Sequence, residues 1–85
     1  MHVIAIHTIS DADLFWSACK RGHAQLPGGT RWALAVASID GTKGINLLVG
    51  ASLEQVKEFF EPLVGPYSTT EYFAADAKNA VGLPS

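Results

Sequence analysis

The sequence predicts an α+β protein whose elements follow the order β-α-β-β-α-β. Three observations lead to this prediction. Four short runs are rich in β-branched residues, as strands are. Two longer segments repeat apolar residues at helical spacing after a capping motif. The stretches "PGG" and "DGTK" supply turn residues between these segments.

The first strand and the first helix are predicted before residue 27. The run "HVIAIHTI" (2–9) has the β-branched composition of a strand. Ser10 and Asp13 then have the spacing of a capping box, and apolar residues recur at positions 12, 15, 19, 22 and 26. We expect this helix to end before Pro27, because proline resists continuation and the next two glycines suit a left-handed cap.

Three strands and a helix are predicted in the rest of the chain. Strands at 31–39 and 44–51 are joined by an Asp-Gly hairpin turn. Ser52 and Gln55 predict a second capping box, and Pro62 together with Gly65-Pro66 is expected to end the helix that follows. The last strand is predicted at 69–77. Residues 1–77 should therefore form one domain, and residues 78–85 a tail that we expect to lie against a partner chain.

Side-chain alternation divides the predicted sheet into two faces. Right-handed connections place both helices on one face of a four-stranded antiparallel sheet with the strand order 4-1-3-2. A bulky set of residues, such as Ile6, Leu34 and Ile45, suits the face beneath the helices. The other set is mostly small and apolar, and we expect it on the uncovered face. It contains Ala35 and the polar residues His7, Arg31, Asn46 and Tyr72.

An uncovered face of this composition predicts a homodimer. An exposed apolar patch usually marks an interface, and twofold pairing is the commonest oligomer. A chain of 85 residues buries only roughly 60–65% of its unfolded surface, so partner surface would stabilise it. The small side chains would leave room for a cavity between the paired sheets.

Several stretches resemble the dimeric α+β barrel superfamily, whose subunits are ferredoxin-like. These are "HVIAIHTI", the Phe-Phe pair of the second helix, and "GPYSTTEYF", which is similar to small bacterial members of unassigned function. The resemblance implies that two sheets pair into a dimeric barrel with a small organic molecule between them. Its haem-binding members place a histidine on or beside the second helix. This chain has none between Ser52 and Pro66, and this departure from the haem-binding members argues against haem.

Composition argues against several other partners and cofactors. Six Lys and Arg against eight Asp and Glu give a net charge of −2, unlike a basic nucleic-acid-binding surface. No apolar run approaches the roughly 20 residues that span a membrane, and the N-terminus lacks signal-peptide features. The single cysteine cannot hold an iron–sulfur cluster and fits a reducing compartment. We therefore expect a cytoplasmic protein without a cofactor.

His7 is the sharpest candidate site residue, because histidine exchanges a proton near neutral pH. Asn46 and Tyr72 share its predicted face, and the strand order brings all three together. Arg31, at a strand start, can bind a ligand carboxylate. Each also has a structural interpretation. His7, Asn46 and Tyr72 can be buried residues with hydrogen-bond partners, and Arg31 can be a solvated charge at the rim.

Cys19 and His23 lie four residues apart on the first predicted helix. Such a pair can activate a thiolate or contribute to a metal site. Two ligands do not make a zinc site, so we predict no metal, and a buried packing role for Cys19 is favoured.

Two functions follow from these predictions. The first is a homodimer that binds a small organic molecule between its sheets, as a binding protein or as a cofactor-free enzyme. In the enzyme, His7 would act as acid or base and Tyr72 or Asn46 would polarise the substrate. The alternative is a non-catalytic dimerising or interaction module whose barrel core is filled by side chains.

Overall fold

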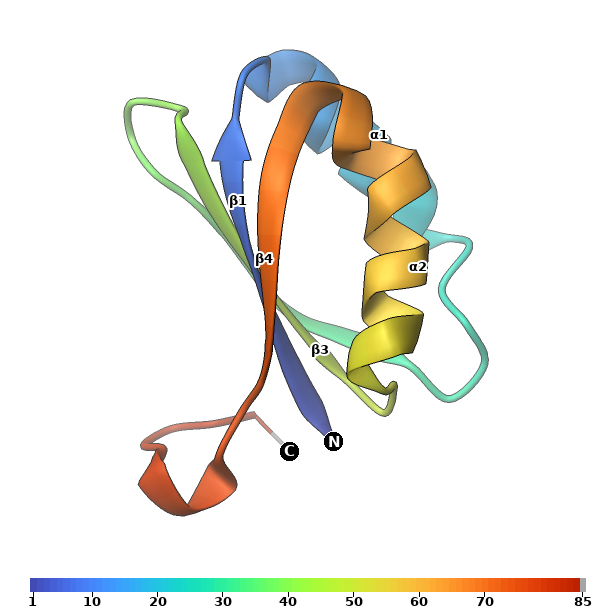
Figure 1. The fold of residues 1–85 in the computed structure, drawn as a ribbon, viewed down its shortest axis with the longest axis vertical. Coiled ribbons are helices and arrows are strands. Elements are labelled where there is room, and N and C mark those ends of the chain that lie inside the picture. Colours follow the sequence, from blue (N-terminus) through green and yellow to red (C-terminus); the bar gives the residue numbers. More distant parts are fainter. Residues whose placement is uncertain (85) are drawn as a thin grey trace.

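Four strands and two helices form two layers in the order predicted (Figure 1). The computed structural model describes residues 1–84. The strands are β1 (His2–Ile9), β2 (Arg31–Ala37), β3 (Lys43–Val49) and β4 (Ser68–Ala74), in one antiparallel sheet of order β2-β3-β1-β4. α1 (Ala12–His23) and α2 (Leu53–Val64) cover one face of this sheet. The ferredoxin-like α+β prediction is therefore confirmed.

The N-cap of α1 differs from the prediction, whereas α2 ends directly before the predicted stop at Gly65-Pro66. The N-cap of α1 is Asp11, whose carboxylate accepts a hydrogen bond from the Leu14 amide at 3.1 Å, whereas the Ser10 hydroxyl donates to the Tyr67 carbonyl. α2 has the predicted capping box between Ser52 and Gln55. It passes through Pro62, because a proline in the last turn removes one helical hydrogen bond and leaves its neighbours able to form theirs, and it ends at Val64, before Gly65-Pro66. No helix among residues 1–84 is long and apolar enough to cross a membrane.

The predicted Asp-Gly turn joins β2 to β3. Gly41 takes φ 79°, a left-handed conformation that favours glycine. The Asp40 carboxylate accepts hydrogen bonds from the Thr42 amide, the Thr42 hydroxyl and the Ser38 hydroxyl. These bonds stabilise the ionised form and lower the pKa of Asp40 to about 2.

The helices cover the face that carries small side chains, which is the reverse of the prediction. Val3, Ala5 and His7 of β1 are fully buried in the core beneath Phe15 and Phe60. Because the helices supply large aromatic rings, the sheet beneath them must supply small residues to keep the layers close. The opposite face of the sheet is uncovered. We call this uncovered surface the open face. Its bulky apolar residues are Ile4, Ile6, Leu34, Val36, Ile45, Leu47 and Phe73.

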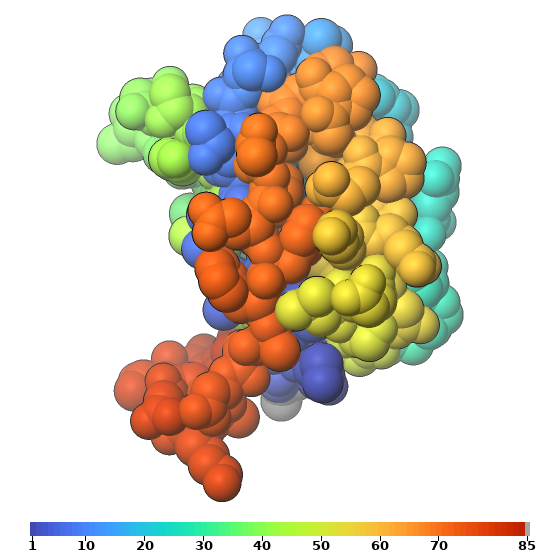
Figure 2. Space-filling view, viewed as in Figure 1, coloured from blue at the N-terminus to red at the C-terminus, as the bar shows by residue number. Residues whose placement is uncertain are grey.

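The tail extends from the body of the molecule beyond β4, which ends at Ala74. The Ala75 amide bonds the His2 carbonyl, a short 3₁₀ turn, η2, follows at Ala77–Asn79, and the His2 imidazole contacts the Pro84 carbonyl. The tail projects on the side of the sheet away from the helices, and so does the β2–β3 hairpin (Figures 1 and 2). Ser85, the last residue of the predicted tail, lies outside the described residues.

Candidate functional site

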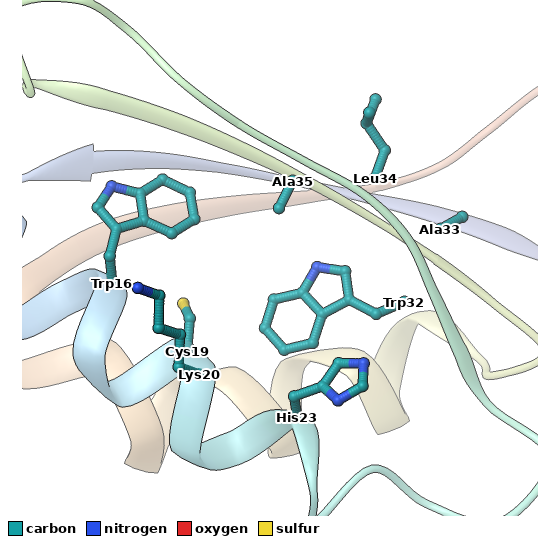
Figure 3. A pocket seen from close by; sticks show the side chains of 8 residues that line it. All are labelled: Trp16, Cys19, Lys20, His23, Trp32, Ala33, Leu34 and Ala35. Atoms are coloured by element: carbon teal, nitrogen blue, oxygen red, sulfur yellow. The ribbon is translucent and has the colours of Figure 1, made fainter.

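An open groove of about 530 Å³ lies between α1 and the edge strand β2 (Figure 3). Its volume falls within the range of small-molecule sites, and its walls are mostly apolar. Four residues line it from α1 and four from β2. They are Trp16, Cys19, Lys20 and His23, and Trp32, Ala33, Leu34 and Ala35.

The α1 wall is one face of a helix, because positions 16, 19, 20 and 23 recur at spacings of three and four residues. Trp16 lies over the sheet at Gly44, where a Cβ atom would come within 3.0 Å of the indole. Phe15 packs edge-on against Trp16, with ring centroids 4.8 Å apart. The absence of a side chain at Gly44 thus permits the position of Trp16.

The β2 wall depends on a register shift between Trp32 and Leu34. An extra residue in one strand re-aims the side chains beyond it. As a result, Trp32 and Ala35 both point toward the helices, while Leu34 points away (Figure 3). The shift also separates Arg31 from Ala35 and Asn46, with which it was predicted to share a face. Arg31 pairs with Val49, which pairs with His2, so Arg31 lies on the uncovered side of the sheet. Arg31 is exposed at the start of β2 and does not line the groove.

A chain of hydrogen bonds runs from the groove into the core. The Trp32 indole donates to Asn46 Oδ1 at 3.0 Å, and Asn46 Nδ2 lies 2.9 Å from His7 Nε2. Because an indole N–H can only donate, it fixes the orientation of the Asn46 amide, and Nδ2 must donate to His7. His7 Nε2 is then an acceptor, and Nδ1 carries the proton that it donates to Thr70 Oγ1 at 2.7 Å.

His7 is therefore held as a neutral core residue. Its side chain is 0% exposed, and its ring contacts Phe15 and Phe60 edge-on. Burial lowers the pKa of His7 to about 4, while the negative charge of Glu61 acts weakly in the opposite direction. The prediction that His7 lies on the uncovered face is wrong, because the helix layer covers it. His7 does not line the groove.

Tyr72 and Asn46 also lie on the face beneath the helices, where both pair with Ala5 in the sheet register. The predicted grouping of His7, Asn46 and Tyr72 on one face is confirmed, but the face is the covered one. Of these three side chains, only His7 and Asn46 are hydrogen-bonded to each other. The Tyr72 hydroxyl donates to Glu61 of α2, and burial together with this carboxylate raises the pKa of Tyr72.

Cys19 and His23 both reach the groove but do not form an activated pair. Cys19 is buried, and burial raises the pKa of its thiol to about 11, so the thiol is protonated at neutral pH. The His23 ring stacks on Trp32, with centroids 5.9 Å apart. Within residues 1–84, no three His, Cys, Asp or Glu side chains gather closely enough to hold a metal ion.

The sequence prediction missed this groove as a site. One signal was available, the spacing of Trp16, Cys19, Lys20 and His23 along one helix face. The β2 contribution had no such signal, because "RWALAVA" contains no glycine or proline to mark a register shift. No protein-family model matches the chain, and no curated protein matches it.

Proposed function

We propose that this protein is a homodimer in which each subunit binds a small organic molecule in the α1–β2 groove. The groove carries the proposal, since about 530 Å³ suits a small ligand and two indoles are among its mostly apolar lining. The proposed ligand site therefore lies between the sheet and α1, whereas the sequence predicts it between two paired sheets.

The dimer half of the proposal rests on the open face. Val36, Ile45 and Phe73 remain 47%, 41% and 44% exposed there, and together with their neighbours they form a continuous apolar surface. Monomeric proteins rarely leave such a surface uncovered. Lys43, Arg31 and Glu71 add charges of both signs to this face, which suits a self-complementary contact across a twofold axis. We therefore take a second copy of the same face as its cover.

Two projecting segments support the same choice of partner. The hairpin tip carries Ile39 and the tail carries Val81, and both side chains are fully exposed. Both segments reach beyond the sheet on the side of the open face (Figure 1). In a face-to-face dimer they would contact the partner's rim, in keeping with the resemblance to the dimeric α+β barrel superfamily.

One observation favours the alternative of a non-catalytic dimerising module. The open face carries bulky residues in place of the small ones predicted, so two such faces would fill the space between them. The paired sheets would then form a packed core without a lumen. The groove decides between the two functions, because all of its lining residues except Leu34 lie outside this interface, and a pure dimerising module would leave the groove empty.

We propose ligand binding in the groove without acid–base catalysis by His7. Both nitrogens of His7 are occupied by Asn46 and Thr70 in the core. The groove itself offers a protonated thiol, at Cys19, and the imidazole of His23. These groups support binding and orientation of a ligand.

The test is a fragment screen in which the two indole N–H resonances in two-dimensional NMR spectra report binding. Both tryptophans of the chain line the groove, so a ligand that enters it should shift both resonances. Ala35→Phe fills the groove and should abolish these shifts. Ala74→Phe is the matched control, since Ala74 is an exposed alanine on the other edge strand. The proposal would be contradicted by fragments that bind the Ala35→Phe variant as tightly as the wild type. It would also be contradicted if no fragment shifts the indole N–H resonances.

A further inference from the structure

The groove is a slot with a rigid aromatic ring at each end. Trp16 and Trp32 stand on either side of Cys19 (Figure 3). Trp32 is fixed by its hydrogen bond to Asn46 and by edge contacts with Phe59 and Phe60, at centroid distances of 6.0 and 5.4 Å. Rings that are held in place before binding lose little freedom when a ligand arrives.

The middle of the slot is formed by small side chains. Ala35 lines it from β2, so the space between the two indoles is not filled from the sheet, and Ala33 lies beyond Trp32 (Figure 3). Indole faces and edges favour stacked or edge-to-face contacts with another aromatic ring. The shape therefore suits a flat aromatic molecule better than a branched aliphatic one.

The charge of the lining selects the ligand further. No Asp or Glu is among the lining residues, and Lys20 contributes the one ammonium group. Lys20 is exposed, and its ammonium group makes no hydrogen bond or ion pair with the rest of residues 1–84. An anionic group on the ligand would therefore find a cation at the mouth of the slot without displacing an existing partner.

We propose that the groove selects a flat aromatic carboxylate, with its ring between Trp16 and Trp32 and its carboxylate on Lys20. This inference rests on the proposed function, because it names the ligand class of the same site. The aromatic ring supplies contact area with the indoles. The carboxylate supplies a charge-assisted contact that a neutral aromatic compound lacks.

The experiment compares three probes of similar size, 2-naphthoate, 2-naphthamide and decalin-2-carboxylate, by titration of the two indole N–H resonances. We expect 2-naphthoate to bind about fivefold more tightly than the neutral amide, which corresponds to a partly solvated ion pair. The saturated acid should bind more weakly than the aromatic acid, because it cannot stack on the indoles.

Variants of Lys20 assign the charge effect. Lys20→Met should remove the preference for the acid over the amide, and Lys20→Arg should keep it. Lys57→Met, on the exposed surface of α2, is the control and should also keep it. A preference that survives Lys20→Met would overturn the assignment of the carboxylate to Lys20.

The outcomes separate this inference from the proposed function. Equal affinity for naphthoate and naphthamide overturns the proposed preference for a carboxylate. Equal affinity for the two acids overturns the proposed preference for an aromatic ring. In both cases the groove remains a binding site. If none of the three probes shifts the indoles while other fragments do, the ligand class is wrong. If no fragment shifts them either, the proposed function fails as well.

Discussion

His7 shows how one buried side chain can be fixed in a single protonation state. Trp32 can only donate, Asn46 must therefore accept from it and donate to His7, and His7 must accept at Nε2. A proton on Nε2 would face the Asn46 amide hydrogens. Turning the amide would remove the clash only by presenting its NH₂ group to the Trp32 indole. Both burial and hydrogen bonding thus oppose the charged form.

Acid should therefore destabilise the protein through His7. In the unfolded chain His7 takes up a proton below about pH 6.5, whereas in the folded protein it does so only near a pKa of about 4. Between these values the unfolded state binds more protons, so acid favours unfolding. The contribution of His7 to the free energy of unfolding is fully present above pH 6.5. It is lost as the pH falls to 4, and the total loss is about 3 kcal/mol. Urea unfolding between pH 7 and pH 4.5 measures it.

His7→Asn provides the control for this titration. The variant lacks the imidazole, so its stability should depend less steeply on pH between 6.5 and 5. At pH 7 it should be about 1–3 kcal/mol less stable than wild type, because Asn46 and Thr70 lose a buried partner. An unchanged pH slope would contradict the suppressed protonation of His7 in the folded protein, and loss of ligand binding at unchanged stability would place His7 in a site and contradict its core role.

Gly50 is a second residue whose conformation is imposed by the fold. It follows β3 with φ 93°, and a Cβ atom there would lie 2.2 Å from the carbonyl oxygen of Gly29. An alanine at this position would meet both an unfavourable backbone conformation and a backbone clash.

Gly50→Ala should therefore lower the free energy of unfolding by at least about 1–3 kcal/mol. Gly28→Ala is the matched control from the same neighbourhood. Its φ is not in the left-handed region and its Cβ atom would meet nothing within 4 Å, so its stability should stay close to wild type. Thermal or urea unfolding of both variants checks this. Equal stability of the two would show that the contact between Gly50 and Gly29 is absent in solution.

At the scale of elements, the helices and strands follow from local sequence signals. The Ser52–Gln55 capping box, the Asp-Gly turn and the order of the four strands all appear as predicted. These features depend on residues close together in the chain, or on connection rules that apply generally. Even the displaced N-cap moves by only one residue, from Ser10 to Asp11.

The assignment of the two sheet faces depended on tertiary packing, and there the prediction failed. Alternation correctly grouped His7, Asn46 and Tyr72, but it could not show which group the helices cover. Side-chain size was taken to decide, with bulky residues placed inside. The interior instead combines large rings on the helices, such as Phe15 and Phe60, with small residues such as Ala5 on the sheet. The total volume of a core constrains its packing, and either layer can supply the bulk.

The register shift in β2 is the other feature beyond sequence reasoning. It breaks the alternation at Ala33 and brings Trp32 to the same side as Ala35. Without it, Trp32 and Ala35 would lie on opposite faces and the groove would lose one of its two indoles. A shift on an edge strand disturbs pairing with only one neighbour, so little in the local sequence needs to accommodate it.

At the scale of the whole molecule, the open face should determine the oligomeric state. Ile45 lies on the central strand β3 and is 41% exposed in one subunit. In a lone subunit, Ile45→Glu would place its carboxylate in water at little cost. In a face-to-face dimer the same carboxylate would be buried without a partner, so the variant should sediment as a folded monomer.

Leu14→Glu is the matched control for this change. Leu14 is an exposed apolar residue of similar exposure, at 48%, and it lies on α1, away from the open face. This variant should sediment as the wild type does. A wild-type protein that is monomeric and soluble at micromolar concentration, or a dimer that survives Ile45→Glu, would contradict pairing through the open face.

The most direct test of the whole account is native mass spectrometry of the wild-type protein with 2-naphthoate. The mass reports the number of chains and the number of bound molecules in one spectrum. The account predicts a dimer of the 9.0 kDa chain that takes up two molecules of ligand, one in each α1–β2 groove. A monomer would contradict the paired open faces. A dimer that saturates with one ligand would contradict the groove, because a single molecule per dimer is the result expected of a site shared between the two sheets.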